Sequence, residues 1–183
     1  GNDDNVIGDE AIFATLQGAI DAIPKFMNGK TVRITLQTNC TENIKIDYFT
    51  AGAIRIYFNG KTLYGNIKSY ACYATVSIYG GTYSDTTAST GVIHPSTALS
   101  FGSRSVSVGF EACGYSAIYN MKIYAPDNLA TTNTEKVAVG AQAGNGAVYI
   151  SAVQIVNAVI GFRANNMGRI QVASSSGIAS KYA

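Results

Sequence analysis

The sequence predicts an all-β protein built as a parallel β-helix, a solenoid of about 22 residues per coil that begins with one capping α-helix. Three observations lead to this prediction. Charged residues make up only 13% of the 183 residues, while Gly numbers 19 and Tyr 12, a composition typical of strands and turns. Short stretches of alternating apolar and polar residues return at a regular interval, which has the length of one such coil. A helical pattern stands near the start of the chain, before these stretches begin.

The predicted helix covers residues 9–24. Its apolar residues stand three and four positions apart and would lie along one face: Phe13, Leu16, Ile20 and Ile23. Asp9 suits the N-cap position, and Pro24 ends the pattern. Because a solenoid is open at its first coil, we expect the apolar face of the helix to cover that end. Residues 1–8 are polar and acidic and are interpreted as a linker.

The repeat is clearest in three predicted strands that begin at Val32, Ile54 and Val76, each one interval after the strand before. Residues two apart in each strand are apolar, so we predict that they form inward-facing columns. The residues between them would face outward, in columns of Arg33, Arg55 and Ser77 and of Thr35, Tyr57 and Tyr79. Further copies of the pattern are separated by the same interval or by one position more, at 42–45 and 65–68, at 146–150 and 168–172, and at 137–139 and 160–162.

Two solenoid types fit an interval of this length. A leucine-rich repeat requires regularly placed leucines, and the chain is poor in leucine, whereas a parallel β-helix requires short strands with inward Val, Ile, Ala and Phe. The sequence therefore favours a β-helix over residues 9–183, with about five or six coils spaced by about 4.8 Å. Residues 84–105 and 125–135 lack the alternation and are predicted to be loops outside the stack. The last residues resemble an unfinished coil, as expected for a segment of a longer protein or for an end that another chain covers.

The early part of the chain also resembles a known family. The order of Phe13-Ala-Thr-Leu-Gln-Gly-Ala-Ile-Asp-Ala-Ile-Pro24, Asn28-Gly-Lys-Thr-Val-Arg-Ile34, Glu42-Asn-Ile44 and Ile56-Tyr-Phe-Asn-Gly60 is similar to the start of certain phage and prophage tail domains. These are the pectate-lyase-like, single-stranded right-handed β-helix domains of tailspikes and minor structural proteins. The resemblance covers residues 9–85. It implies a component of a virion or phage-like particle, a homotrimer that meets other tail proteins and bacterial surface polysaccharide. Some members of this group cleave the polysaccharide, and others only bind it.

The candidate carbohydrate-binding residues are Tyr57, Tyr79, Arg33 and Arg55. The two tyrosines occupy one outward column on adjacent coils, where flat rings with a hydroxyl suit sugars. The arginines lie beside that column and are suited to acidic groups of a glycan. Two other interpretations stay open, namely that the tyrosines stack on one another or that they pack between the subunits of a trimer.

No catalytic residue is assigned from the sequence. Polysaccharide hydrolases need paired carboxylates, and lyases of this architecture need an acidic cluster. The acidic residues beyond the helix are isolated from one another: Glu42, Asp47, Asp85, Glu111, Asp127 and Glu135. Only Asp85 and Glu111 would meet, if the loop at 84–105 folds back. The prediction therefore leans away from an enzyme, with a tailspike-type lyase or hydrolase and a non-binding spacer or adhesin segment as the alternatives.

Neither a metal nor another cofactor is predicted. Cys40, Cys72 and Cys113 have no metal-type spacing and are read as small buried thiols. His94 precedes Pro95-Ser96, but two neighbours in a loop make no triad, so we read it as a surface histidine. A net charge of +2 gives no case for nucleic acid. The uncharged stretch 137–162 is too rich in Gln, Asn and Gly to insert into a membrane, and no signal peptide is recognised, so we expect a soluble protein of the virion.

Overall fold

The computed structural model describes residues 11–95, 99–101, 104–125, 136–142, 147–158 and 160–178. In these residues the chain forms 17 strands and one short helix, and the strands make up three sheets. All strand pairs described in these sheets are parallel except that of β8 (Leu99–Phe101) with β9 (Arg104–Glu111). The all-β class with parallel sheets that the sequence predicts is confirmed.

The first sheet has six strands, and its order follows the chain: β1 (Thr31–Thr35), β3 (Ala53–Tyr57), β6 (Thr75–Tyr79), β10 (Ser116–Tyr119), β13 (Ala147–Ser151) and β16 (Arg169–Ala173). The second sheet contains β4 (Thr62–Leu63), β7 (Gly91–Ile93), β11 (Met121–Tyr124), β14 (Gln154–Val156) and β17 (Ser176–Ile178). The third sheet contains β2 (Ile44–Asp47), β5 (Ile67–Tyr70), β9, β12 (Lys136–Gln142) and β15 (Ile160–Asn165).

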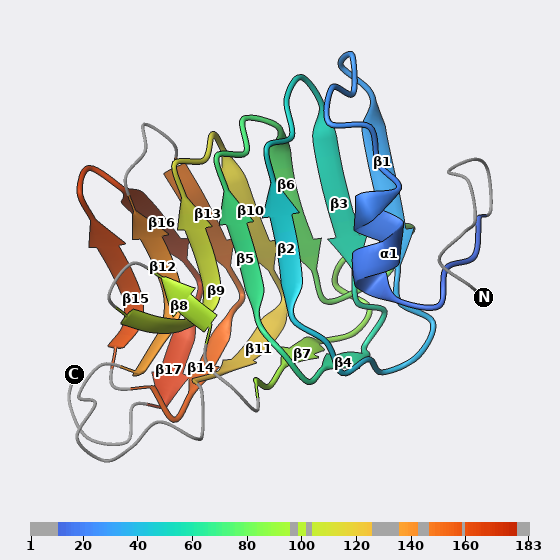
Figure 1. The fold of residues 1–183 in the computed structure, drawn as a ribbon. Helices are drawn as coiled ribbons and strands as arrows, with labels where there is room; N and C mark the ends of the chain where they lie inside the picture. Colours follow the sequence, from blue (N-terminus) through green and yellow to red (C-terminus); the bar gives the residue numbers. More distant parts are fainter. Residues whose placement is uncertain are drawn as a thin grey trace.

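From β3 onward the chain visits the three sheets in a fixed order, from the first to the second to the third and back to the first, whereas β1 is followed directly by β2 of the third sheet. We call each such circuit a coil. One coil consists of β3, β4 and β5, and the next of β6, β7 and β9. The colours of Figure 1 accordingly run from blue to red along the stack, because each coil lies directly beside the one before it. Every outward position of one coil therefore has a neighbour on the next coil, about 4.8 Å away.

The columns predicted from the repeat are present in the strand registers. Val32 pairs with Ile54, and Ile54 pairs with Val76. The column then continues to Ser116 of β10, which follows Val76 by much more than the repeat interval. The prediction that residues 84–105 form only a loop is wrong, because β7, β8 and the start of β9 lie within them. The second predicted loop, 125–135, lies almost wholly outside the described residues.

The interior of the stack holds aliphatic side chains from all three sheets. Fully buried examples are Ile54, Ile56 and Ile78 of the first sheet, Ile93 of the second and Ile67 of the third. Burial of such side chains contributes about 1.5–3 kcal/mol each relative to exposure, so this interior is the main source of stability.

The corner between the third sheet and the next coil is made in the same way on several coils. Tyr48, Ala71, Ala112 and Asn166 stand in matching positions just after the strands of the third sheet, and each has a positive φ between 47° and 64°. A left-handed residue is costly for any side chain other than Gly. The stacked strands on both sides hold the backbone in this conformation, and the chain turns sharply there.

The helix α1 (Leu16–Asp21) is shorter than predicted. Its N-cap is Thr15, whose hydroxyl accepts the amide hydrogen of Gly18, so Phe13 precedes the helix and Asp9 lies outside the described residues. The helix still buries Leu16 and Ile20 in the same interior as the strands, and Figure 1 shows it at the end of the stack that β1 forms.

Two side chains fix the helix to the first coil. The carboxylate of Glu42 accepts the amide hydrogens of Leu16 and Gln17 at 2.8 and 2.9 Å. The side-chain amide of Gln17 accepts from the backbone N–H of Lys45 at 2.7 Å and donates to the carbonyl of Lys45 at 3.1 Å. Gln17 thus pairs with β2 as a neighbouring strand would, and it covers the outer edge of the third sheet.

Candidate functional site

A ladder of tyrosines lies on the outward face of the first sheet. Tyr57, Tyr79 and Tyr119 occupy the same position on β3, β6 and β10. The ring centroids of Tyr57 and Tyr79 are 5.0 Å apart with an angle of 13° between the ring planes, and those of Tyr79 and Tyr119 are 5.0 Å apart at 7°. The rings therefore stack face to face across the neighbouring strands of the sheet, at nearly the spacing of those strands. Tyr149 extends the row, with its centroid 5.7 Å from that of Tyr119.

Tyr119 was missed in the sequence because it follows Tyr79 by much more than one repeat interval. A local signal does exist, since Ala117-Ile118-Tyr119-Asn120 repeats the alternation of Ser77-Ile78-Tyr79-Gly80, with an inward Ile before an outward Tyr. The insertion between the two strands hides this signal from a search at a fixed interval.

Tyr57 supports this face from below and adds almost nothing to its surface, because only 2% of it is exposed. One side of its ring stacks on Tyr79, and Tyr83 packs edge-on against it with centroids 5.7 Å apart. Tyr83 comes from the segment after β6 and is itself 57% exposed. The ring that a ligand meets at this point is therefore that of Tyr83, which the sequence prediction did not include.

Arg33 and Arg55 lie side by side on this face, as predicted, because they are register partners on β1 and β3. The guanidinium carbon of Arg33 lies 4.4 Å from the centre of the Tyr83 ring, within the range of a cation–π contact. Arg33 is exposed and Arg55 is half-buried. The four predicted residues thus lie on one face, with Tyr83 joining Arg33 to the ladder.

The outward positions of the described first-sheet strands contain no acidic residue. They are Thr31, Arg33, Thr35, Ala53, Arg55, Tyr57, Thr75, Ser77, Tyr79, Ala117, Tyr119, Ala147, Tyr149, Ser151, Arg169, Gln171 and Ala173. The face is therefore positively charged and rich in hydroxyl groups. Burial raises the pKa of Tyr119 to about 12, and the hydrogen bond with Tyr115 adds to the rise. Its hydroxyl is protonated at neutral pH and can both donate and accept hydrogen bonds.

A second aromatic column lies on the outward side of the second sheet. The His94 ring lies between Tyr64 and Tyr124, with centroids 6.3 Å and 4.3 Å away. The Lys122 ammonium lies 5.0 Å from the centre of the Tyr124 ring. His94 is half-buried among these rings, and Ser96 lies outside the described residues. Successive members of this column are further apart in the chain than the repeat interval, so a search at that interval did not find it.

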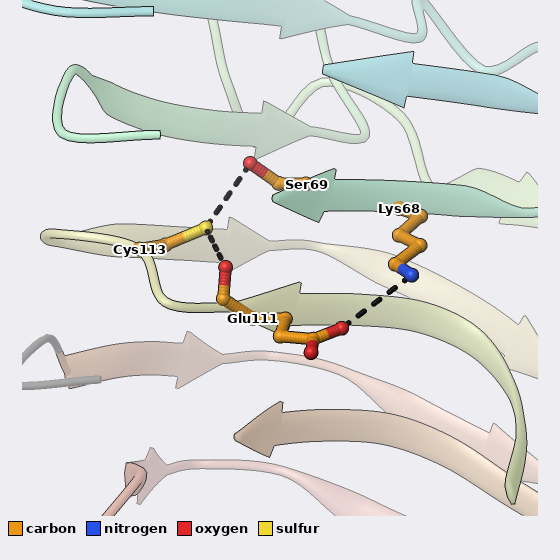
Figure 2. A network of polar contacts seen from close by, with 4 residues as sticks. All are labelled: Lys68, Ser69, Glu111 and Cys113. Atoms are coloured by element: carbon orange, nitrogen blue, oxygen red, sulfur yellow. Dashed lines mark hydrogen bonds and ion pairs between the residues drawn. The ribbon is translucent and has the colours of Figure 1, made fainter. Parts of the chain in front are cut away.

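The described acidic side chains lie in separate places, and one carboxylate oxygen of Asp47 is buried without a hydrogen-bond partner among the described residues. Glu42 binds the start of the helix, and Asp85 accepts hydrogen bonds from the amide and hydroxyl of Thr87, which lower the pKa of its carboxyl group. Glu111 lies 3.4 Å from the Lys68 ammonium on the third sheet (Figure 2). Asp85 is hydrogen-bonded within its own turn between β6 and β7, whereas Glu111 of β9 pairs with Lys68, so the polar contacts described for the two carboxylates do not include each other. Asp127 and Glu135 lie outside the described residues.

The cysteines are free thiols, and Cys72 and Cys113 share the buried hydroxyl of Ser69 as a hydrogen-bond partner. Figure 2 shows the Cys113 sulfur donating toward the Ser69 hydroxyl and the Glu111 carbonyl, each at 3.3 Å. Burial raises the pKa of Cys72 to about 11 and that of Cys40 to about 12, and it also raises the pKa of Cys113. These thiols are therefore protonated at neutral pH.

Two further observations concern the described residues as a whole. Nowhere in them do three or more His, Cys, Asp or Glu side chains gather in a way that suits a metal ion. No helix in the same residues has the length and hydrophobicity needed to cross a membrane.

The outward face of the first sheet, with its ladder, its arginine pair and Tyr83, is the candidate site; we call it the tyrosine face. No protein-family model, no curated protein and no solved structure matches the chain, so the chemistry of the tyrosine face is argued from its own geometry.

Proposed function

We propose that the chain is a single-stranded, right-handed parallel β-helix that serves as a structural protein in the tail of a phage or phage-like particle and binds bacterial surface polysaccharide. The fixed visiting order of the three sheets and the helix at the first coil support the architecture. The resemblance of residues 9–85 to tail β-helix domains supports the setting. That setting also includes a homotrimer and contacts with other tail proteins.

The observation that carries the binding role is the tyrosine ladder. Its rings are held by stacking on one another and by the sheet beneath, so their hydroxyl groups form a row with a fixed spacing. Binding to such a row costs little side-chain entropy, because the rings do not need to be ordered first. A polysaccharide presents hydroxyl groups and apolar C–H faces at regular intervals. The ladder offers hydroxyl groups, while Tyr83 offers an exposed ring.

A structural spacer is the second candidate, and one observation favours it. The ladder tyrosines use their ring faces to contact each other, which stabilises the stack whether or not a ligand binds. The two functions therefore differ in whether the hydroxyl groups matter. Stacking needs only the rings, whereas hydrogen bonding to a sugar needs the hydroxyls.

The test exchanges hydroxyl groups without removing rings. We expect the double variant Tyr79→Phe with Tyr119→Phe to stay folded, with at most a small loss of thermal stability from the hydrogen bond between Tyr119 and Tyr115, and to lose retention in gels that contain capsular or lipopolysaccharide fractions from a panel of bacteria. Tyr70→Phe on the third sheet is the matched control and should be retained like the original chain. Equal retention of the double variant, or no retention of any protein by any fraction, would favour the spacer.

A further inference from the structure

We propose that the ligand of the tyrosine face is an acidic polysaccharide, whose anionic oxygens are bound by Arg33 and Arg55 with Tyr83 as a positioning residue. This inference rests on the proposed polysaccharide-binding function and specifies the class of ligand. The anionic groups are carboxylates of uronic-type sugars or phosphodiesters, which present the same charged oxygens to a guanidinium group.

The first step is the arginine pair itself. Arg33 and Arg55 are direct neighbours on adjacent parallel strands, and both face outward. Like charges in this arrangement repel each other. The only ion pair between described residues joins Lys68 and Glu111 on the third sheet, and the described outward positions of the first sheet hold no acid. No ion pair within the described part of the chain therefore offsets this repulsion, and an anionic ligand across both strands would offset it.

The second step is the placement of Arg33. Its guanidinium group lies over the Tyr83 ring, and the Tyr83 ring packs against Tyr57 of the ladder. A cation–π contact uses none of the N–H donors of the guanidinium group in a hydrogen bond, so they stay available for a carboxylate or phosphate. Lysine lacks the planar fork of donors that a guanidinium group has. The arginine is thus directed by aromatic contacts, as in sites that recognise anions with defined geometry.

The third step is the anchoring of Tyr83, which is exposed and lies outside any strand. Hydrogen bonds close the turn around it, from the Thr82 amide to the Asp85 carbonyl at 2.9 Å and from the Asp85 amide to the Thr82 hydroxyl at 3.0 Å. The Asn120 side chain, from the next coil, donates to the Ser89 carbonyl at 2.6 Å. The segment that carries Tyr83 is therefore fixed to the stack before any ligand binds.

The ligand would lie along the solenoid axis, because the arginines and the ladder follow each other in that direction. Arg33 and Arg55 lie on β1 and β3, and the ladder continues over β6 and β10. Charged groups of the polymer would meet the arginine end, and hydroxyl groups would meet Tyr79 and Tyr119.

The test compares three polymers by affinity electrophoresis: alginate, its neutral propylene-glycol ester and a phosphodiester-linked ribitol teichoic acid. We expect retention by alginate, by the teichoic acid or by both, with little retention by the ester and weaker binding at high salt. Retention by one acidic polymer alone identifies the anion. Arg55→Gln should weaken acidic binding about tenfold, and Lys45→Gln on the third sheet is the charge-matched control.

Tyr83 is tested through its coupling to Arg33. Tyr83→Ala should weaken acidic binding, and the double variant with Arg33→Gln should lose less than the sum of the two single losses, because Tyr83 acts in part through its contact with Arg33. Equal retention by alginate and its ester, or unchanged binding by both arginine variants, would overturn the inference. If the double variant Tyr79→Phe with Tyr119→Phe still lost retention in the bacterial panel, the proposed polysaccharide-binding function would stand even though the inference of an acidic ligand did not. Retention by none of the three polymers also overturns the inference, and the panel then decides separately on the function.

Discussion

Replacing Gln17 with Ala should loosen the capped end of the stack in a measurable way. The Gln17 side chain takes part in three hydrogen bonds, two with the backbone of Lys45 and one that it donates to the Asp21 carboxylate at 2.8 Å. All three are exposed, so water replaces part of each, and a net loss of about 0.5–1 kcal/mol per bond is expected. Alanine returns a few tenths of a kcal/mol through its higher helix propensity. The expected loss of stability is therefore about 1–2.5 kcal/mol, or about 2–10 °C in Tm for a chain of this size.

The decisive measurement is local. The backbone N–H of Lys45 finds its partner in the Gln17 side chain, so hydrogen exchange at this amide should become faster in Gln17→Ala while amides in β6 keep their protection. Gln37→Ala is the matched control, because Gln37 is exposed and its side chain bonds to no other described residue. Unchanged exchange at Lys45, with a stability equal to that of the control, would refute the view that Gln17 takes the place of a strand.

Three other predictions concern the interior, the ladder and the thiols. Ile78→Ala removes a fully buried side chain and should cost about 2–5 kcal/mol in urea unfolding, whereas Ile12→Ala, at an exposed site outside the strands, should change stability by less than about 0.5 kcal/mol; similar losses would contradict the inward column. The pKa of Tyr119 is raised to about 12 in the folded chain, so the stability that its protonated hydroxyl contributes is present below about pH 10 and is lost as pH rises toward 12. Tyr119→Phe should therefore unfold less readily in alkali than the original chain, and identical dependence of the two stabilities on pH would oppose this. With the pKa of Cys40 near 12 and that of Cys72 near 11, both should react slowly with a thiol reagent at neutral pH until denaturant is added, and fast labelling of the native chain would show that they are accessible.

The parts of the fold that the sequence reveals are those where the repeat interval is unbroken. β1, β3 and β6 follow one another at a constant interval, so their register could be predicted residue by residue. The step from β6 to β10 contains an additional hairpin formed by β8 and β9, which makes this step much longer than the others. A fixed period carries no information across an insertion, and the ladder was therefore predicted at half its length.

The helix shows a different limit. Its apolar spacing predicts the buried face correctly, but its start depends on the Glu42 carboxylate, which is 26 residues from Leu16 in the chain. The burial of Tyr57 depends in the same way on Tyr83, from a segment without periodicity. Local patterns indicate which side of an element is apolar, whereas contacts between distant segments decide where it ends and what covers it.

Stability and function can be separated on the tyrosine face, because its outward side chains form columns in which each side chain is next to the one at the same position on the neighbouring strand. Tyrosines gain from this arrangement by stacking, so stability alone explains the ladder. Arginines lose from it, because Arg33 and Arg55 repel each other. The pair is therefore the feature of this face that stability does not explain.

This asymmetry gives a last prediction about Arg55. Without ligand, Arg55→Gln should be more stable than Arg55→Lys by about 0.2–1 kcal/mol, because only the lysine variant keeps the charge next to Arg33. The same glutamine variant should bind acidic polysaccharide more weakly, which is the usual conflict between stability and function at a binding site. Thermal unfolding at low salt measures the difference, and high salt should reduce it. If the glutamine variant were instead the less stable of the two, the charge of Arg55 would be balanced within the chain, and the argument for an anionic ligand would lose its basis.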